Sequence, residues 1–118
     1  HLERRKSMIE TVYHYERTEN FVMAKVVDDE HVNINHIVVQ PGGAVPVHVA
    51  NSNVYQIVVR GTLSLSLEDG EPHLYTVGDI ISVPFNTKMA IRNGGADTLE
   101  FFVVKTPNPR DMPATKKI

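Results

Sequence analysis

The sequence predicts an all-β fold, a sandwich or barrel of short strands, and three observations support it. No stretch of ten or more residues has apolar side chains at three- and four-residue spacing, so no amphipathic helix is expected. Residues 62–67 alternate leucine with threonine or serine, which is typical of a strand with one buried face. Glycine, proline and aspartate separate further short apolar segments, a pattern typical of antiparallel sheets.

The clearest turns define the middle of the chain. Asp69-Gly70 predicts a hairpin between residues 62–67 and 73–77. Gly78-Asp79 predicts the next turn, before a strand at 80–83. The remaining predicted strands are residues 12–15, 21–27, 32–40, 45–49, 53–60, 88–92 and 98–105.

The composition limits the domain count and the partners. There is no internal repeat or linker, so we expect a single domain over residues 8–118, with residues 1–7 (HLERRKS) derived from a vector. The lack of cysteine excludes disulfides, cysteine-bound zinc and thiol nucleophiles, and favours a cytoplasmic location. The formal net charge is −2 without a basic run, so we expect neither nucleic acid nor membrane as a partner.

Two stretches between residues 41 and 107 have glycine, histidine, proline and asparagine at the spacings of a known pair of sequence motifs. The positions concerned are Gly42, His48 and Gly61 in a first stretch and Gly78, Pro84 and Asn93 in a second. In this spacing the chain resembles the cupin superfamily, whose motifs are G-x5-H-x-H-x3-4-E-x6-G and G-x5-P-x-G-x2-H-x3-N. The chain is therefore identified as a small single-domain cupin. The resemblance implies a double-stranded β-helix, that is, a jelly-roll barrel of two antiparallel sheets.

The same resemblance bears on metal binding, because in metal-binding cupins three histidines and a glutamate at these motif positions hold a divalent ion. Here the first position is His48, but the other three are Ala50, Val54 and Met89. Alanine and valine have no lone pair, and one imidazole falls short of the three protein ligands that catalytic zinc sites use. We therefore expect no metal cofactor, and a weakly bound divalent metal is the alternative. Asn86 stands where the second motif usually has glycine.

Strand alternation extends the site. If Val54 points inward, so do Gln56 and Val58, and Ile91 follows Met89. The predicted ligand pocket consists of His48, Ala50, Val54, Gln56, Val58, Met89 and Ile91. Equally, Gln56 could bond a neighbouring strand, and His48 could be a barrel-wall histidine bonded to a neighbour or to water. The opposite face, Tyr55-Ile57-Val59, is apolar, and covering it predicts a homodimer.

Four functions remain open at this point. The leading one is binding of a small organic ligand whose identity the sequence leaves unknown. The second is a metal-independent enzyme, as in the deoxysugar epimerase branch of the superfamily, with His48 as the base. The third is a metalloprotein with displaced ligands such as His36 or Asn53, where the orientation of His36 is undecided because both faces of residues 32–40 are apolar. The fourth is a structural dimer without a ligand.

Overall fold

The computed structural model describes residues 8–118, which form nine β-strands and one short 3-10 helix. The strands are β1 (Val22–Asp28), β2 (Asn33–Val39), β3 (His48–Val49), β4 (Asn53–Arg60), β5 (Thr62–Leu67), β6 (His73–Thr76), β7 (Ile80–Val83), β8 (Lys88–Asn93) and β9 (Leu99–Thr106), and the helix is η1 (Pro109–Asp111). The prediction that residues 1–7 derive from a vector falls outside the described residues. In the described part of the chain, no helix is long and apolar enough to cross a membrane.

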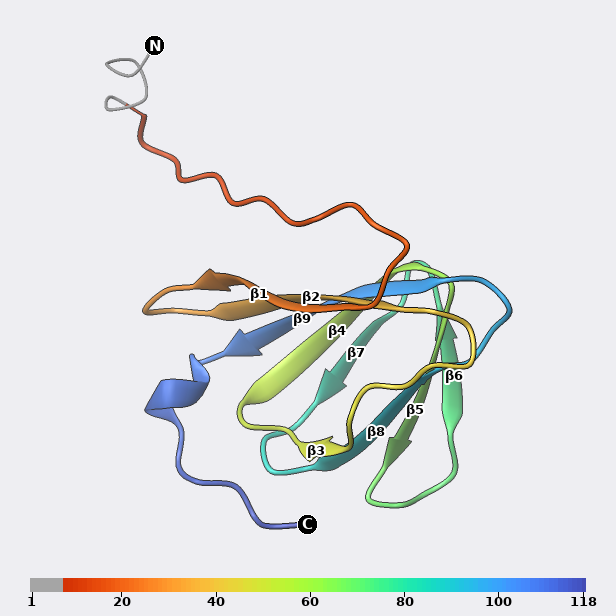
Figure 1. Cartoon of the computed structure of the whole chain (residues 1–118). Helices are drawn as coiled ribbons and strands as arrows, with labels where there is room; N and C mark the ends of the chain where they lie inside the picture. The colour runs from red at the N-terminus through yellow and green to blue at the C-terminus, as the bar shows by residue number, and fades with distance from the viewer. Residues whose placement is uncertain (1–7) are drawn as a thin grey trace.

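The strands form two antiparallel sheets that face each other (Figure 1). One sheet has the order β1-β2-β9-β4-β7, and the other has the order β3-β8-β5-β6. After β2, every connection except the β5–β6 hairpin crosses from one sheet to the other. This winding is the predicted jelly-roll barrel of two antiparallel sheets, so the fold class is confirmed.

Most predicted strands exist within one or two residues of their predicted bounds, and two differ more. The strand predicted at residues 12–15 is wrong, because this segment is exposed and pairs with no strand. The strand predicted at 45–49 shrinks to β3, since Pro46 has no N–H to donate to a ladder. Ala44 keeps an isolated bridge to Arg92 ahead of it.

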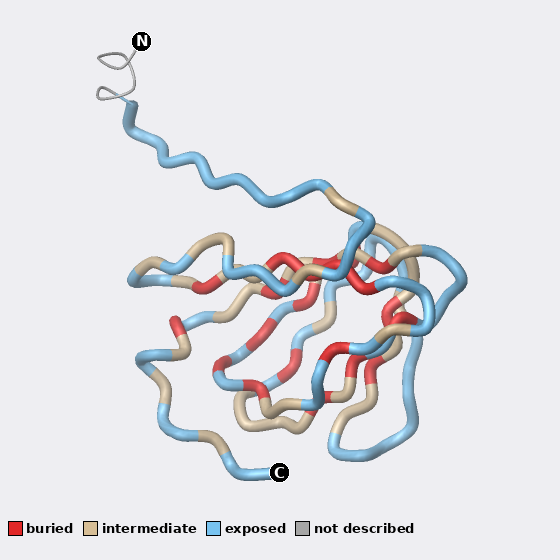
Figure 2. The backbone as a smooth tube through the Cα atoms, in the orientation of Figure 1, coloured by how far each residue is buried: buried red, intermediate tan, exposed pale blue. Residues whose placement is uncertain are grey.

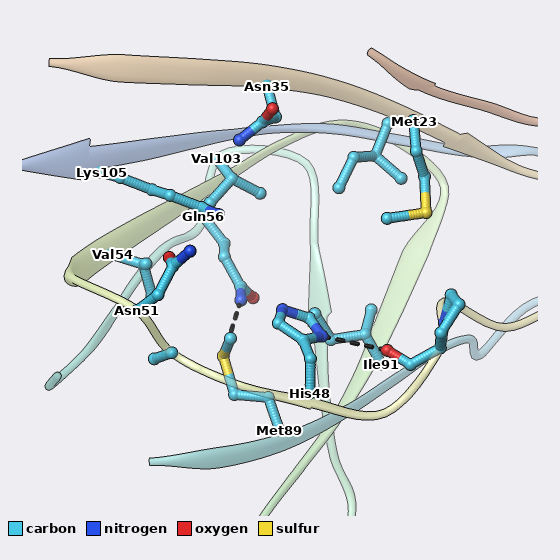
Figure 3. A pocket seen from close by; sticks show the side chains of 13 residues that line it. Met23, Asn35, His48, Asn51, Val54, Gln56, Met89, Ile91, Val103 and Lys105 are labelled. Carbon is cyan, nitrogen blue, oxygen red and sulfur yellow. Dashed lines mark hydrogen bonds between the residues drawn. The ribbon is translucent and has the colours of Figure 1, made fainter. Parts of the chain in front are cut away.

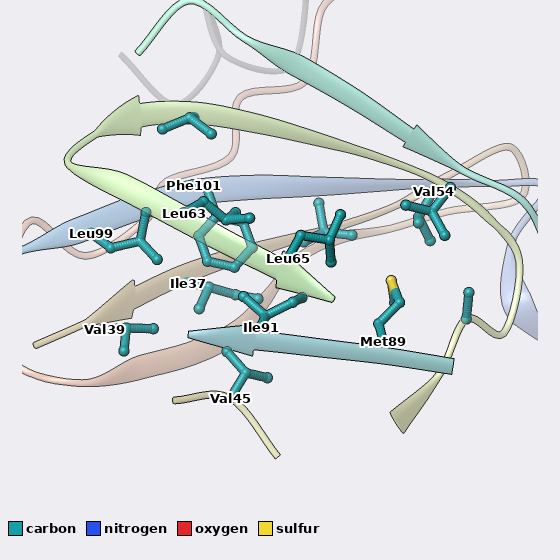
Figure 4. Close-up of a cluster of buried hydrophobic side chains, with 14 residues drawn as sticks. Ile37, Val39, Val45, Val54, Leu63, Leu65, Met89, Ile91, Leu99 and Phe101 are labelled. Atoms are coloured by element: carbon teal, nitrogen blue, oxygen red, sulfur yellow. The ribbon is translucent and has the colours of Figure 1, made fainter. Parts of the chain in front are cut away.

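The core lies between the sheets and consists of the inward-facing residues of strands from both sheets (Figure 2). Leu63 and Leu65 on β5 are buried while the polar residues beside them, Thr62, Ser64 and Ser66, are partly exposed, which confirms the predicted alternation. Phe101 of β9 packs among them from the opposite sheet (Figure 4). Full burial of one such side chain contributes about 1.5–3 kcal/mol.

Left-handed backbone conformations explain several of the motif positions. Gly61 has φ +78° between β4 and β5, and Gly78 has φ +100° between β6 and β7. Asn86, in the usual place of a motif glycine, has φ +69°. Asparagine is among the residues that tolerate this region best, so the turn survives the substitution.

The two glycines give a matched test. A Cβ at Gly61 would collide with the carbonyl of Thr98, whereas a Cβ at Gly78 has no heavy atom within 4 Å. Both alanine variants carry the positive-φ penalty of about 1–2 kcal/mol. We expect Gly61→Ala to destabilise by about 3 kcal/mol, because overpacking adds about 1–3 kcal/mol, and Gly78→Ala by about 1 kcal/mol. Equal losses for the two variants in urea unfolding would contradict this packing.

Candidate functional site

A cavity of about 240 Å³ lies between the two sheets at one end of the barrel (Figure 3). It is bounded by β1, β2, β4 and β9 from the five-stranded sheet and by β3 and β8 from the other. The residues that line it are Met23, Asn35, Ile37, Pro46, His48, Ala50, Asn51, Val54, Gln56, Met89, Ile91, Val103 and Lys105.

The structure brings six of the seven predicted pocket residues together around this cavity. These six are His48, Ala50, Val54, Gln56, Met89 and Ile91. Pairing of β3 with β8 puts His48 opposite Met89. Val58 is also buried, but it packs in the apolar core and does not line the cavity.

Several lining residues were missed by sequence reasoning, and Met23, Asn35, Val103 and Lys105 are four of them. They lie on β1, β2 and β9, which carry none of the family's metal ligands. Register places Met23 beside Ile37, and it places both Asn35 and Gln56 beside Val103. Only the order of strands in the sheet reveals these neighbours, so alternation within one strand could not have found them.

Gln56 is the most deeply buried polar group of the cavity, with none of its surface exposed. Its Nε2 donates a long hydrogen bond of 3.5 Å to the Met89 sulfur. Within residues 8–118 no protein group bonds its Oε1. The amide nitrogen thus bonds a side chain of another strand, β8, while the amide oxygen has no partner among the described residues.

His48 is held in one orientation by its own loop. Its Nδ1 lies 3.0 Å from the Pro46 carbonyl oxygen, which can only accept, so Nδ1 carries the proton of this bond. In the neutral ring Nε2 is then the acceptor, and that edge of the ring faces the cavity (Figure 3). His48 and Gln56 thus offer two acceptors to the same space.

Lys105 adds a cation at the margin of the cavity. Burial lowers the pKa of its amine below the ordinary value, and the charge of Lys25 lowers it further. His48 and Lys105 are the titratable side chains that line the cavity among residues 8–118.

The comparisons with known proteins agree with this architecture. A family profile described as "Cupin domain" matches residues 35–105, more than half of the chain. The chain belongs to the cupin family. An uncharacterized protein of Methanocaldococcus jannaschii is 50% identical over 108 residues, which are 91% of this cupin and 93% of that protein.

Solved structures extend the similarity. The crystal structure of the same Methanocaldococcus jannaschii protein is of an RmlC-like cupin family protein with a double-stranded β-helix fold; it is 50% identical with a TM-score of 0.84, covering 88% of this chain and 96% of that one. An uncharacterized conserved protein with a double-stranded β-helix domain, from Klebsiella pneumoniae, is 18% identical with a TM-score of 0.71, covering 87% and 92%. The second similarity supports the fold alone.

The side chains at the family's ligand positions do not fit a metal ion. Ala50 and Val54 present hydrocarbon to the cavity, and the Met89 sulfur accepts from Gln56. Among the described residues, no three histidine, aspartate or glutamate side chains come together in a way that could hold an ion. His48 alone cannot chelate one.

The two displaced ligands considered from the sequence lie elsewhere. His36 points to the outer face of β2, is fully buried there, and its Nε2 lies 2.6 Å from Glu100 Oε2. The rings of Tyr15 and Phe102 cover it, with centroids 4.6 and 5.0 Å away. The Asn53 side chain accepts from the Phe85 N–H. Neither lines the cavity with His48.

Measuring the metal content of the purified protein tests whether these side chains bind an ion. We expect dialysed protein to hold far less than one equivalent of iron, zinc, nickel, manganese or copper, because three of the four family ligands are hydrocarbon or thioether. His48→Ala should leave that content unchanged. A full equivalent that survives dialysis and disappears in His48→Ala would contradict the assignment.

Proposed function

We propose that this cupin binds a small organic molecule in the cavity between its sheets, without a metal. The observation that carries the proposal is the buried Gln56 amide, whose Oε1 has no partner among the described residues. A buried acceptor left unpaired costs about 1–3 kcal/mol. A ligand that donates a hydrogen bond to this oxygen recovers that cost, so the site favours an occupant with an O–H or N–H group.

The walls of the cavity agree with such an occupant. Aliphatic and thioether side chains surround a small number of polar groups, which is typical of small-molecule sites. The volume of about 240 Å³ is slightly below the roughly 300–1,000 Å³ of common ligand pockets. We therefore expect a ligand smaller than a typical drug.

The four methionines of the chain provide a test of location. Met23 and Met89 line the cavity, whereas Met8 and Met112 do not. In protein labelled at the methionine methyl groups, fragments from a library that bind should shift the Met23 and Met89 resonances and leave those of Met8 and Met112 in place. The expected affinity loss in Gln56→Leu for fragments with a donor group is about tenfold.

Two outcomes would count against this site. One is a library in which no fragment shifts Met23 or Met89. The other is equal shifts at all four methyls, which would indicate binding to exposed surface. Val58→Ile is the matched control, because Val58 is buried on the same strand outside the cavity and should leave fragment affinities unchanged.

A second candidate is a metal-independent enzyme of the epimerase or isomerase type, with His48 as the base. The hydrogen bond to the Pro46 carbonyl favours it, because the neutral ring then directs a basic nitrogen into the cavity. The similar structure from Methanocaldococcus jannaschii is described as RmlC-like. In such a reaction Lys105 is the group that could return a proton, since Tyr55 lies on the opposite face of β4.

We also propose a homodimer formed through the outer apolar face, which consists of Tyr55, Ile57, Val59 and Ile80. Pairing of β4 with β7 puts Ile57 beside Ile80, so their side chains share this face. Tyr55 is 41% exposed and Ile80 is 65% exposed. Among the strands of residues 8–118, β7 pairs only with β4 and so forms an edge of its sheet. A second copy would cover both this edge and the apolar side chains.

Light scattering on charge variants checks this interface. We expect a dimer mass for the wild-type protein and a monomer mass for Ile80→Glu, because a buried unpaired carboxylate is unfavourable. Val77→Glu is the control, since Val77 is 61% exposed in the preceding turn and should leave the mass unchanged. A monomeric wild type at tens of micromolar would contradict the proposal.

The amino-acid composition supports a proposal for the cellular location and for the partners that are not expected. A chain without cysteine suits a reducing cytoplasm, and its slight net negative charge disfavours nucleic acid and anionic lipid as partners. We propose the cytoplasm as its location on this basis.

A further inference from the structure

Lys105 is the exception to an otherwise apolar row. The inward side chains of β9 before it are Leu99, Phe101 and Val103, and all three are buried. Register with Val54 on β4 puts Lys105 on the same inward face. A lysine at the end of this row brings a positive charge to the cavity that holds Gln56.

No acidic side chain of residues 8–118 forms an ion pair with Lys105, although several other lysines have one. Lys88 pairs with Asp69 at 2.9 Å, and Lys116 pairs with Glu68 at 2.6 Å. The carboxylate of Asp28, in the neighbouring surface depression, accepts from Asn108 at 2.7 Å and lies 3.8 Å from Lys25. Lys105 also borders that depression, but among residues 8–118 no carboxylate lies within ion-pair distance of its amine.

The charged donor of the cavity and its acceptors lie in different places. Figure 3 shows Lys105 and Asn51 on one side of the cavity and His48 on the other. Lys105 can only donate, while His48 Nε2 and Gln56 Oε1 accept. An occupant that satisfies all three carries an acceptor with negative charge at one end and a donor at the other.

From this arrangement we infer that the ligand is a small organic acid, with its carboxylate bound by Lys105 and a hydroxyl or similar donor directed to Gln56 and His48. The inference rests on the proposed binding function and names its substrate class. Lys105 repels a cationic ligand. A dianion such as a phosphate ester would face one lysine and hydrocarbon walls, which do not repay its desolvation.

Three related compounds test the carboxylate and the hydroxyl of the proposed ligand independently. Meta-hydroxybenzoate carries both groups, benzoate lacks the hydroxyl, and meta-hydroxybenzamide replaces the carboxylate by a neutral amide. Binding is followed at the Met23 and Met89 methyls, which line the cavity. We expect meta-hydroxybenzoate to bind about tenfold more tightly than either of the others, since a hydrogen bond to a charged group contributes about 1.5–3 kcal/mol.

Variants then assign each preference to a residue. Lys105→Met should abolish the preference for the acid over the amide, and Gln56→Leu should abolish the preference for the hydroxyl. Lys25→Met is the charge-matched control, because Lys25 lies on β1 and pairs with Asp28, and it should change the affinity less than about threefold. Lys105→Met should also raise the melting temperature of the free protein, which a lysine needed for structure would not do.

The outcomes distinguish this inference from the proposed function. If acid and amide bind equally and Gln56→Leu weakens both, the cavity binds small molecules but the carboxylate assignment is wrong. The assignment is also wrong if Lys25→Met removes the preference as fully as Lys105→Met does. If none of the three probes shifts Met23 or Met89, both proposals are contradicted.

Discussion

The pairing of β9 with β2 on one side and with β4 on the other is the constraint on which the rest of the structure depends. This strand puts Leu99 and Phe101 into the core and Val103 at the wall of the cavity. A shift of one residue in its register would turn every one of these side chains outward and bring Phe102 and Val104 inward. The position of the cavity and the chemistry of its walls therefore follow from one register.

The fold is that of the cupin family, but the positions of the family's metal ligands carry different chemistry here. Three positions that hold metal ligands in metal-binding cupins are hydrocarbon or thioether here, and the imidazole of His48 remains. A drier wall raises the cost of any polar group left without a partner. The Gln56 Oε1 carries that cost, and partial burial lowers the pKa of Lys105. A ligand of the proposed kind would supply the missing partner of the Gln56 oxygen.

The outer face of the five-stranded sheet shows how a distant segment completes a buried polar pair. His36 and Glu100 lie across β2 and β9, and Arg60 Nε lies 3.5 Å from the other oxygen of Glu100. The ring of Tyr15, from the segment before β1, packs against His36 at a tilt of 46°. Residues 8–14, which precede Tyr15, extend away from the sheet as an exposed arm (Figure 1).

The sequence by itself determined the fold class, most strand positions and half of the cavity. Alternation at residues 62–67, turn residues such as Gly78 and the spacing of the two motifs are local signals, and local signals survive without knowledge of the neighbours. Gln56 was predicted in this way from Val54, two residues earlier. Lys105 and the outward orientation of His36 were not, because residues far apart in the chain become neighbours only when the strand order is known. The failed strand at 12–15 has the same cause, since a strand exists only where another strand supplies its hydrogen bonds.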